Sequence, residues 1–226
     1  MMVLAIEYST EKRSVALGLD GKILGVLPDE SMHRVTPLAL IDQLLLSKEV
    51  SRSEIRRIVV GIGPGSYTGI RNAISTAQGW QLATDVELLG IGNSLGMARV
   101  LSRAGKRGKV HILSDAQQNH FYHAEFRIDD SGDVDPVGSL KISSLQSVQF
   151  LVERQEVIAG PGLDRILKCG AVDIHPSAEL LLETAEGRKD FASGDQLTPF
   201  YLRTTRFVKA PEPTEFIQNL ISRFSS

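Results

Sequence analysis

The chain has 226 residues, 42% of them hydrophobic and 23% charged, which is typical of a globular protein with a sizeable core. Its 25 basic and 27 acidic residues give a net charge of -2, without the basic excess of a free-standing nucleic-acid binder. The single cysteine, Cys169, excludes an intramolecular disulfide framework and a thiolate zinc cluster. No signal peptide and no stretch long enough to span a membrane is recognisable, so we expect a soluble, cytoplasmic protein.

The first thirty residues predict three strands joined by tight turns. Residues 2–7 are apolar, residues 13–19 alternate, and residues 22–27 form a third apolar run. Asp20 and Gly21 separate the last two runs, and an Asp-Gly pair in that position is a strong hairpin signal. We therefore expect a sheet that begins with antiparallel strands.

Two amphipathic helices are predicted next, over residues 36–46 and 67–83. Thr36 is suited to the N-cap and Pro37 to the first helical position. Apolar side chains then recur at helical spacing. They are Leu38, Ile41, Leu44 and Leu45 in the first helix, and Ile70, Ala73, Ile74, Ala77 and Trp80 in the second.

Strands are predicted at residues 57–61 and 88–91, and a third helix from Ser94 to about residue 104. Helical crossovers between strands imply a partly parallel sheet. The glycine-containing residues 103–108 are the best candidate linker, so we divide the chain into residues 1–106 and 107–226. In the second part we expect strands at residues 109–115, 121–128 and 157–159, and a helix at residues 177–187.

The turn of residues 61–69 is rich in glycine and lies between a strand and a helix. Backbone amides at such a helix N-terminus can hold a phosphate group. The Lys-Ser or Lys-Thr pair of a Walker A loop is missing, and the glycine spacing departs from the dinucleotide fingerprint. The alternative is a tight turn in which Ser66 or Thr68 caps the helix.

The helix of residues 67–83 carries small residues that allow two helices to approach closely. These are Ala73, Ala77, Gly79 and Ala83. They indicate either a contact with a partner helix or ordinary packing inside the protein.

Taken together, these motifs resemble those of one family. Residues 3–11 look like its opening strand and phosphate turn, and residues 61–71 like its most diagnostic stretch. Further matching stretches are residues 77–79, 90–95, 97–98, 115–116, 121–126 and 199–203. Over essentially its whole length the sequence resembles the TsaB family, also called YeaZ, of the actin-like ATPase superfamily.

The resemblance implies an α/β, actin-like (ribonuclease H-like) fold with two lobes, mixed sheets and a reduced second lobe. It also implies a non-catalytic subunit that binds and activates the catalytic subunit TsaD, working with the ATPase TsaE. That machinery transfers threonylcarbamoyl to N6 of adenosine 37 in tRNA, which this subunit would contact only through the complex.

In that family the first two helices form most of the pairing surface and also support a homodimer. The residues expected at this surface are Leu38, Ile41, Leu45, Ile70, Ala73, Ile74, Ala77 and Trp80.

The same resemblance and the glycine turn suggest a set of phosphate contacts: Glu7, Ser9, Thr10, Gly63, Gly65, Ser66 and Asp115. Three positions depart from the family pattern. Glu7 replaces an aspartate, Tyr8 a small hydroxyl residue, and Gln117 an arginine. We therefore expect no catalytic residue and no required cofactor, with weak nucleotide binding left open.

Two enzyme classes remain as alternatives. One is an ATP-binding phosphotransferase or ATPase, in which Glu7 and Asp115 face each other across a cleft. The other is an M22-type metallopeptidase, but the His-x-x-x-His helix of TsaD-like subunits has no counterpart, because Pro37 stands four residues after His33.

The other histidines give no metal site from sequence alone. His120 and His123 are three residues apart in a predicted strand, so their side chains point to opposite faces. We expect them to be surface or turn residues, and we expect His111 and His175 to be isolated. Arg203, Arg206 and Lys209 are interpreted as a solvated charged segment.

Overall fold

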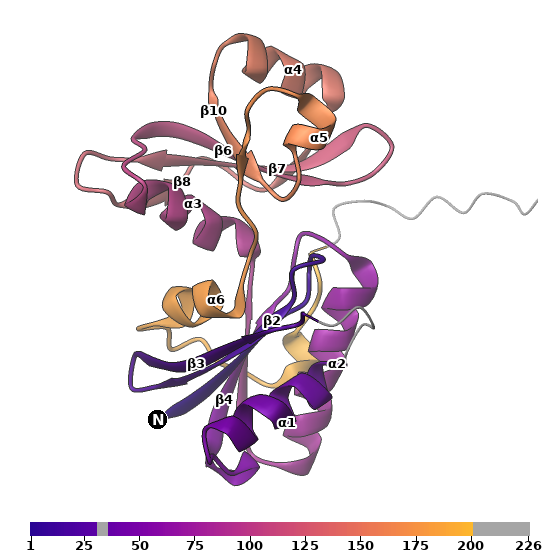
Figure 1. Cartoon of the computed structure of the whole chain (residues 1–226), viewed down its shortest axis with the longest axis vertical. Helices are drawn as coiled ribbons and strands as arrows, with labels where there is room; N and C mark the ends of the chain where they lie inside the picture. Colours follow the sequence, from indigo (N-terminus) through magenta and orange to yellow (C-terminus); the bar gives the residue numbers. More distant parts are fainter. Residues whose placement is uncertain (31–35, 201–226) are drawn as a thin grey trace, which may run out of the picture.

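The computed structural model describes residues 1–30 and 36–200 and contains two lobes (Figure 1). The lower lobe is built on a five-stranded sheet in the order β3-β2-β1-β4-β5. Its strands are β1 (Met2–Glu7), β2 (Ser14–Leu19), β3 (Lys22–Pro28), β4 (Ile55–Gly61) and β5 (Glu87–Ile91). The first three are antiparallel neighbours, whereas β1, β4 and β5 run parallel, as predicted.

Helices α1 (Pro37–Ser47) and α2 (Tyr67–Ala83) cover one face of this sheet. Both start as predicted: the Ala39 amide donates to Thr36 Oγ1 at 3.4 Å, and the Gly69 amide donates to Ser66 Oγ at 3.3 Å. The short 3₁₀ turn η1 (Arg52–Glu54) leads from α1 into β4. The apolar stripes of both helices pack against β1 and β4 and form the main core of the lower lobe.

The other face of the lower sheet is covered by α6 (Ala178–Ala185), which comes from much later in the chain. Leu181 packs there against the small residues Ala5 and Ala16. The Ala178 amide also donates to Ser14 Oγ at 2.9 Å. Residues 191–197, with the turn η2 (Gly194–Gln196), then run beside α2 and β5.

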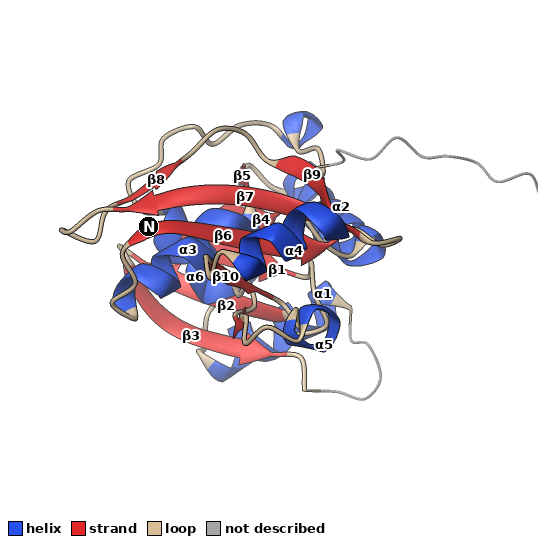
Figure 2. Ribbon diagram, turned by 90° about the horizontal axis from the view of Figure 1, so that it is seen from above, coloured by secondary structure: helices blue, strands red, loops and turns tan. Residues whose placement is uncertain are grey.

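The upper lobe has a six-stranded mixed sheet with the order β11-β10-β6-β7-β8, and β9 also pairs with β7. Its strands are β6 (Gly108–Asp115), β7 (His120–Ile128), β8 (Val134–Pro136), β9 (Lys141–Ser144), β10 (Val157–Gly160) and β11 (Val172–Asp173). Helices α4 (Leu145–Glu153) and α5 (Asp164–Leu167) lie on one face, and α4 is seen over the sheet in Figure 2.

Helix α3 (Asn93–Arg103) packs on the opposite face of the upper sheet through Met97, Ala98 and Leu101. Gly92 is its N-cap, so the prediction that Ser94 caps this helix was wrong. The Asn93 side chain at this end is bonded to Ser9 instead of capping the helix.

The expected linker at residues 103–108 joins α3 to β6, and both of these elements pack in the upper lobe. Each lobe contains a helix from the other half of the sequence, because α3 packs above and α6 below (Figure 1). The division into residues 1–106 and 107–226 stays a prediction about the chain. Among residues 1–30 and 36–200, every helix is too short or too polar to cross a lipid bilayer.

Candidate functional site

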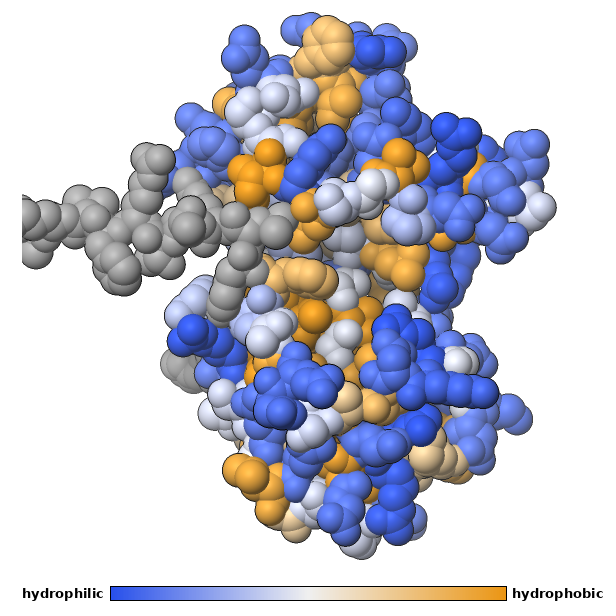
Figure 3. Space-filling model, turned by 180° about the vertical axis from the view of Figure 1, so that it is seen from behind, coloured by the Kyte–Doolittle hydropathy of each residue, from blue (hydrophilic) through white to orange (hydrophobic). Residues whose placement is uncertain are grey.

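A cleft of about 560 Å³ lies between the two lobes. Its walls come from the turn after β1, the glycine turn, the end of β6 and the loop before α5. Five of the seven predicted phosphate contacts line it: Ser9, Thr10, Gly65, Ser66 and Asp115. In the view from behind, the molecule narrows between the lobes, and apolar side chains show at this waist (Figure 3). The structure therefore brings most of the predicted set together.

The glycine turn is closed by the protein's own backbone. The Ser66 amide, at the start of α2, donates to the carbonyl oxygen of Ser9 at 2.6 Å. A Cβ atom on Gly65 would collide with that carbonyl, and one on Gly69 with the carbonyl of Tyr8. The glycines are thus needed for close approach of two backbone segments, which favours the tight-turn interpretation over the phosphate cradle.

Glu7 lies beneath the cleft and is completely buried. Its Oε1 accepts from the Ser9 amide at 2.6 Å, whereas Oε2 has no hydrogen-bond partner. Burial raises the pKa of Glu7 to about 7, against the lowering effect of the bond from Ser9. The expectation that Glu7 and Asp115 face each other across the cleft was wrong, because of the two only Asp115 lines it.

Asn93 links Glu7 to the turn above it. Its Nδ2 donates to Ser9 Oγ at 2.6 Å, while its Oδ1 is buried without a partner. Glu7 Oε2 and Asn93 Oδ1 both lie beside Gly61. A protonated Glu7 places a hydroxyl donor in this pocket of unpaired acceptors. Sequence reasoning missed Asn93, since its role depends on the start of α3 meeting the turn after β1.

Asp115 is exposed, but both of its carboxylate oxygens are engaged by Gln117. The Gln117 amide donates to Oδ1 at 2.7 Å and its Nε2 donates to Oδ2 at 3.1 Å. Gln117, Gln118 and Asn119 all have left-handed backbones, with φ of 65, 53 and 59°. The residue that replaces the expected arginine thus occupies the carboxylate that an enzyme would need for a metal or a proton.

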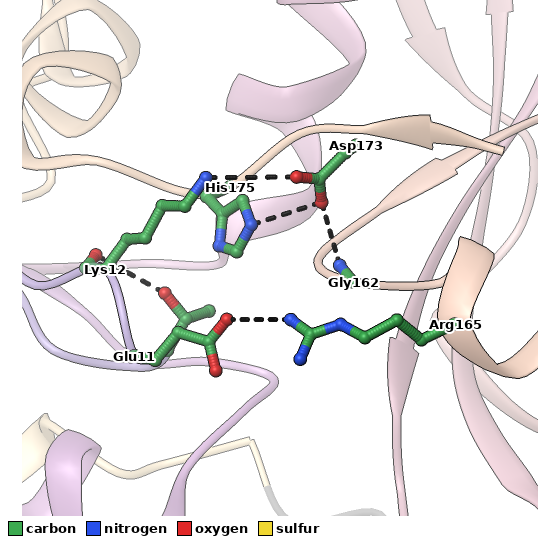
Figure 4. Close-up of polar contacts among 7 residues, drawn as sticks. Glu11, Lys12, Gly162, Arg165, Asp173 and His175 are labelled. Atoms are coloured by element: carbon green, nitrogen blue, oxygen red, sulfur yellow. Dashed lines mark hydrogen bonds and ion pairs between the residues drawn. The ribbon is translucent and has the colours of Figure 1, made fainter.

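Charged side chains meet across the cleft (Figure 4). Arg165 Nη2 lies 3.3 Å from Glu11 Oε1, and Lys12 Nζ lies 3.8 Å from Asp173 Oδ2. All four side chains are more than half exposed, so these pairs add little to stability.

His175 belongs to the same network as Asp173. Its Nε2 lies 3.1 Å from Asp173 Oδ1, which also accepts from the Gly162 amide at 2.8 Å. The Gly162 bond lowers the pKa of Asp173, and burial lowers the pKa of His175. The expectation that His175 is isolated was wrong.

His111 and His123 are also paired, contrary to expectation. His111 Nδ1 and His123 Nε2 are 2.9 Å apart, and only 1% and 4% of these residues are exposed. Burial and the neighbouring His111 lower the pKa of His123 to about 4. His123 is thus not a surface residue. The pairing depends on strand register and has no signal in the spacing of the two residues.

Seven of the eight residues expected at the partner surface are buried in the protein's own core, each at most 8% exposed. These are Ile41, Leu45, Ile70, Ala73, Ile74, Ala77 and Trp80. Leu38 is the exception, at 44% exposed. The helical stripe was read correctly as a buried face, but the lower sheet occupies it. The assignment of this set to a partner stays a prediction, and Leu38 and Trp80 are the two members that line the groove described next.

The outward faces of α1 and α2 offer a different surface. Leu38 and Leu82 are large apolar residues of these helices that are exposed, Leu82 to 91%. A groove of about 360 Å³ lies between α1 and α2. It is lined by Leu38, Arg52, Ser75, Thr76, Gly79, Trp80, Ala83 and Thr84. Gly79 opens into free space, with no atom within 4 Å of a Cβ built on it. We call this surface, which includes Leu38 and Gly79, the α1–α2 groove.

A larger hollow of about 1110 Å³ lies beside α6 and the β2–β3 turn. It contains none of the predicted site residues and mixes charges of both signs, including Arg57, Arg103 and Glu183. His33, Arg203, Arg206 and Lys209 lie outside the residues that the structure describes.

The sequence model of one protein family matches residues 19–181, and it is described as TsaD, tRNA N6-adenosine threonylcarbamoyltransferase. The chain belongs to this family. The matched residues run from the end of β2 into α6, so they include the glycine turn and the upper-lobe wall of the cleft but not the turn after β1.

Within the family, the chain is grouped with TsaB (YeaZ). It is similar to the tRNA threonylcarbamoyladenosine biosynthesis protein TsaB of Escherichia coli, with 33% identity over 58% of each chain. It is also similar to TsaB of Haemophilus influenzae, with 29% identity over 55% of this chain and 53% of the relative. The chain thus spans somewhat more than half the length of these curated relatives.

A solved structure, YeaZ from Pseudomonas aeruginosa, has the same fold. It aligns with a TM-score of 0.70 and 26% identity, over 89% of this chain and 99% of YeaZ. The actin-like, two-lobed α/β fold implied by the sequence resemblance to this family is confirmed.

Proposed function

We propose that the chain is a non-catalytic subunit in the synthesis of threonylcarbamoyladenosine in tRNA, which binds and activates the TsaD catalytic subunit. The family match and the names of the TsaB relatives support the pathway. The observation that carries the non-catalytic part is that polar groups around the cleft are already bonded within the protein. Ser66 is bonded to Ser9, Asp115 to Gln117, and Glu7 is buried below.

The α1–α2 groove is the surface that we propose for TsaD. It belongs to the two helices that the family resemblance implicates, and it includes Leu38, an exposed apolar side chain outside the core cluster. Gly79 allows a partner helix to approach its backbone closely. The same groove would serve a homodimer when TsaD is absent, so the two assemblies would exclude each other.

Within this proposal TsaE acts on the complex and tRNA is contacted mainly by TsaD, in keeping with the net charge of -2 of this chain. The subunit would work where tRNA is modified, in the cytoplasm, and would need no cofactor of its own.

The binding experiment is co-purification of the chain with the cognate TsaD subunit. A Gly79→Arg and Leu38→Glu double variant places charge on two residues that line the groove and should lose the complex. Phe150→Glu is the matched control, since Phe150 is 55% exposed on α4 of the other lobe and should not matter. Undiminished binding by a folded double variant would remove the groove assignment.

The functional experiment is reconstituted tRNA modification with TsaD and TsaE, with and without this chain. Activity should depend on the chain and should survive Asp115→Asn, because Asp115 has no chemical role in the proposal. If the isolated chain turns over Mg-ATP and Asp115→Asn abolishes that turnover, the ATPase alternative is right instead.

A further inference from the structure

Three side chains that can ligate a metal meet on one face of the upper sheet. His111 on β6 pairs directly with Glu125 on β7, and His123 precedes Glu125 by two residues, so all three share a face. His111 Nδ1 lies 2.9 Å from His123 Nε2 and 3.9 Å from Glu125 Oε2. One ligand atom from each residue falls within 4.8 Å of the others.

The opposite ring nitrogens point to acceptors. His123 Nδ1 lies 2.9 Å from Ser143 Oγ on β9. His111 Nε2 is buried without a hydrogen-bond partner, and its nearest acid is Glu156 Oε2 at 3.9 Å. A histidine that binds a metal through one nitrogen normally donates the other N–H to a hydroxyl or carboxylate, which fixes the ring. His123 therefore has the outer contact of such a site, and Glu156 is the carboxylate that could supply it to His111.

Glu125 is held in a way that leaves one oxygen available. Lys109 Nζ pairs with Oε1 at 2.9 Å, while Oε2 faces His111. The side chain of Glu125 is 15% exposed, which gives an ion a path from solvent to two buried histidines. The positive charge of Lys109 opposes an ion, so the site depends on the two imidazoles as well as on the carboxylate.

We propose that His111, His123 and Glu125 bind a divalent transition metal of the zinc class. Zinc takes nitrogen and oxygen ligands at about 2.0–2.2 Å in a tetrahedron, which spaces neighbouring ligand atoms by about 3.3 Å. To reach this spacing, the distance from His111 Nδ1 to His123 Nε2 would lengthen from 2.9 Å, and the distance from His111 Nδ1 to Glu125 Oε2 would shorten from 3.9 Å. Each change amounts to a few tenths of an ångström. Two histidines and one carboxylate leave the fourth position to water.

The site is separate from the cleft, because Ser114 and Tyr122, which line the cleft, alternate with His123 and point to the other face of the sheet. A bound ion would cross-link β6 and β7, and through Ser143 also β9. Its role would be structural, since it would stabilise the upper lobe.

The test uses the full chain without a histidine tag, stripped with EDTA and titrated with zinc chloride and with cobalt chloride. We expect one ion per chain and the intense visible bands of tetrahedral cobalt. His123→Gln should abolish both signals, and Glu125→Gln should weaken binding at least tenfold. Ser143→Ala should weaken it by about tenfold or more, as for other outer contacts.

His175→Gln is the matched control, because His175 is also a shielded histidine beside an acid and should leave the titration unchanged. Should His123→Gln fail to fold, the Glu125→Gln variant at the less buried ligand carries the test, with circular dichroism to confirm its fold. Absence of stoichiometric binding by the wild-type chain would overturn the proposal. So would binding that survives Glu125→Gln unchanged, or that disappears in His175→Gln.

Discussion

The amide of Ser66 donates its hydrogen bond to the carbonyl oxygen of Ser9, with 2.6 Å between nitrogen and oxygen. This bond joins the N-cap residue of α2 to the turn after β1. An anion at the start of α2 would have to displace that carbonyl to reach the same amide. A phosphate site would need the Ser66 amide as a donor, but here that amide holds two segments of the lower lobe together.

The burial of Glu7 predicts that the free energy of unfolding depends on pH. Its pKa is about 7 in the folded chain and 4.5 in the unfolded reference, so the folded state binds more protons between these values. The free energy of unfolding should fall by up to about 3 kcal/mol as the pH rises through this range. Glu7→Gln should abolish the fall, because a neutral amide accepts from Ser9 and donates towards Asn93 Oδ1.

Urea unfolding at pH 5 and pH 8 measures this effect. The variant and the wild type should be similar at pH 5, with the variant more stable at pH 8. Glu153→Gln, at the exposed end of α4, is the control and should follow the wild type. Parallel profiles for Glu7→Gln and the wild type would contradict the burial of an ionisable Glu7.

Two glycines of α2 should respond in opposite directions to alanine. In an open helical position, Gly79→Ala should stabilise the protein by about 1 kcal/mol, since alanine restricts the unfolded chain. Gly69→Ala should destabilise it by about 1–3 kcal/mol, because the new methyl group meets the Tyr8 carbonyl. Equilibrium urea unfolding of the two variants checks this, and a stabilising Gly69→Ala would show that the turns are not in close contact.

A glycine should relieve the backbone strain in residues 117–119, which follow β6 with left-handed φ angles. Gln118 is exposed, has φ of 53°, and its carbonyl oxygen accepts from His120 Nδ1, a bond that a glycine keeps. Gln118→Gly should therefore be neutral or stabilising by up to about 1 kcal/mol. Gln149→Gly, in the exposed face of α4, should cost about 1 kcal/mol. Thermal unfolding compares the two, and equal losses would contradict the left-handed geometry.

The ion pair between Glu11 and Arg165 should contribute little although it bridges the lobes. Both side chains are more than half exposed, so a double-mutant cycle with Glu11→Gln and Arg165→Gln should give a coupling of about 0.5 kcal/mol or less. The coupling should shrink further in 1 M salt. A large coupling that resists salt would mean that the cleft is held closed by this pair.

Local signals predicted much of the lower lobe. Thr36, Pro37 and Ser66 marked the starts of α1 and α2, and the Asp20-Gly21 turn marked the β2–β3 hairpin. The apolar stripe of Ile70, Ile74 and Ala77 also identified a buried face. Helical periodicity indicates that a face is buried but not whether the protein's own sheet or a partner covers it, so the partner surface stays a prediction.

Contacts between distant segments were beyond the reach of sequence spacing. The pairing of His111 with His123 follows from the register of β6 and β7. The meeting of Asn93 with Ser9 requires the start of α3 to reach the turn after β1. The burial of Glu7 follows from the same packing. Each depends on the three-dimensional course of the chain and not on any local pattern.

The placement of α6 on the lower sheet also affects the order in which the protein can form during synthesis. Ala5, Ala16 and Val59 are made early, yet the helix that covers them ends at Ala185. Until that helix leaves the ribosome, one apolar side of the first sheet stays open to solvent and to chaperones. The lower lobe, although it starts the chain, would be completed only after the upper lobe has been synthesised.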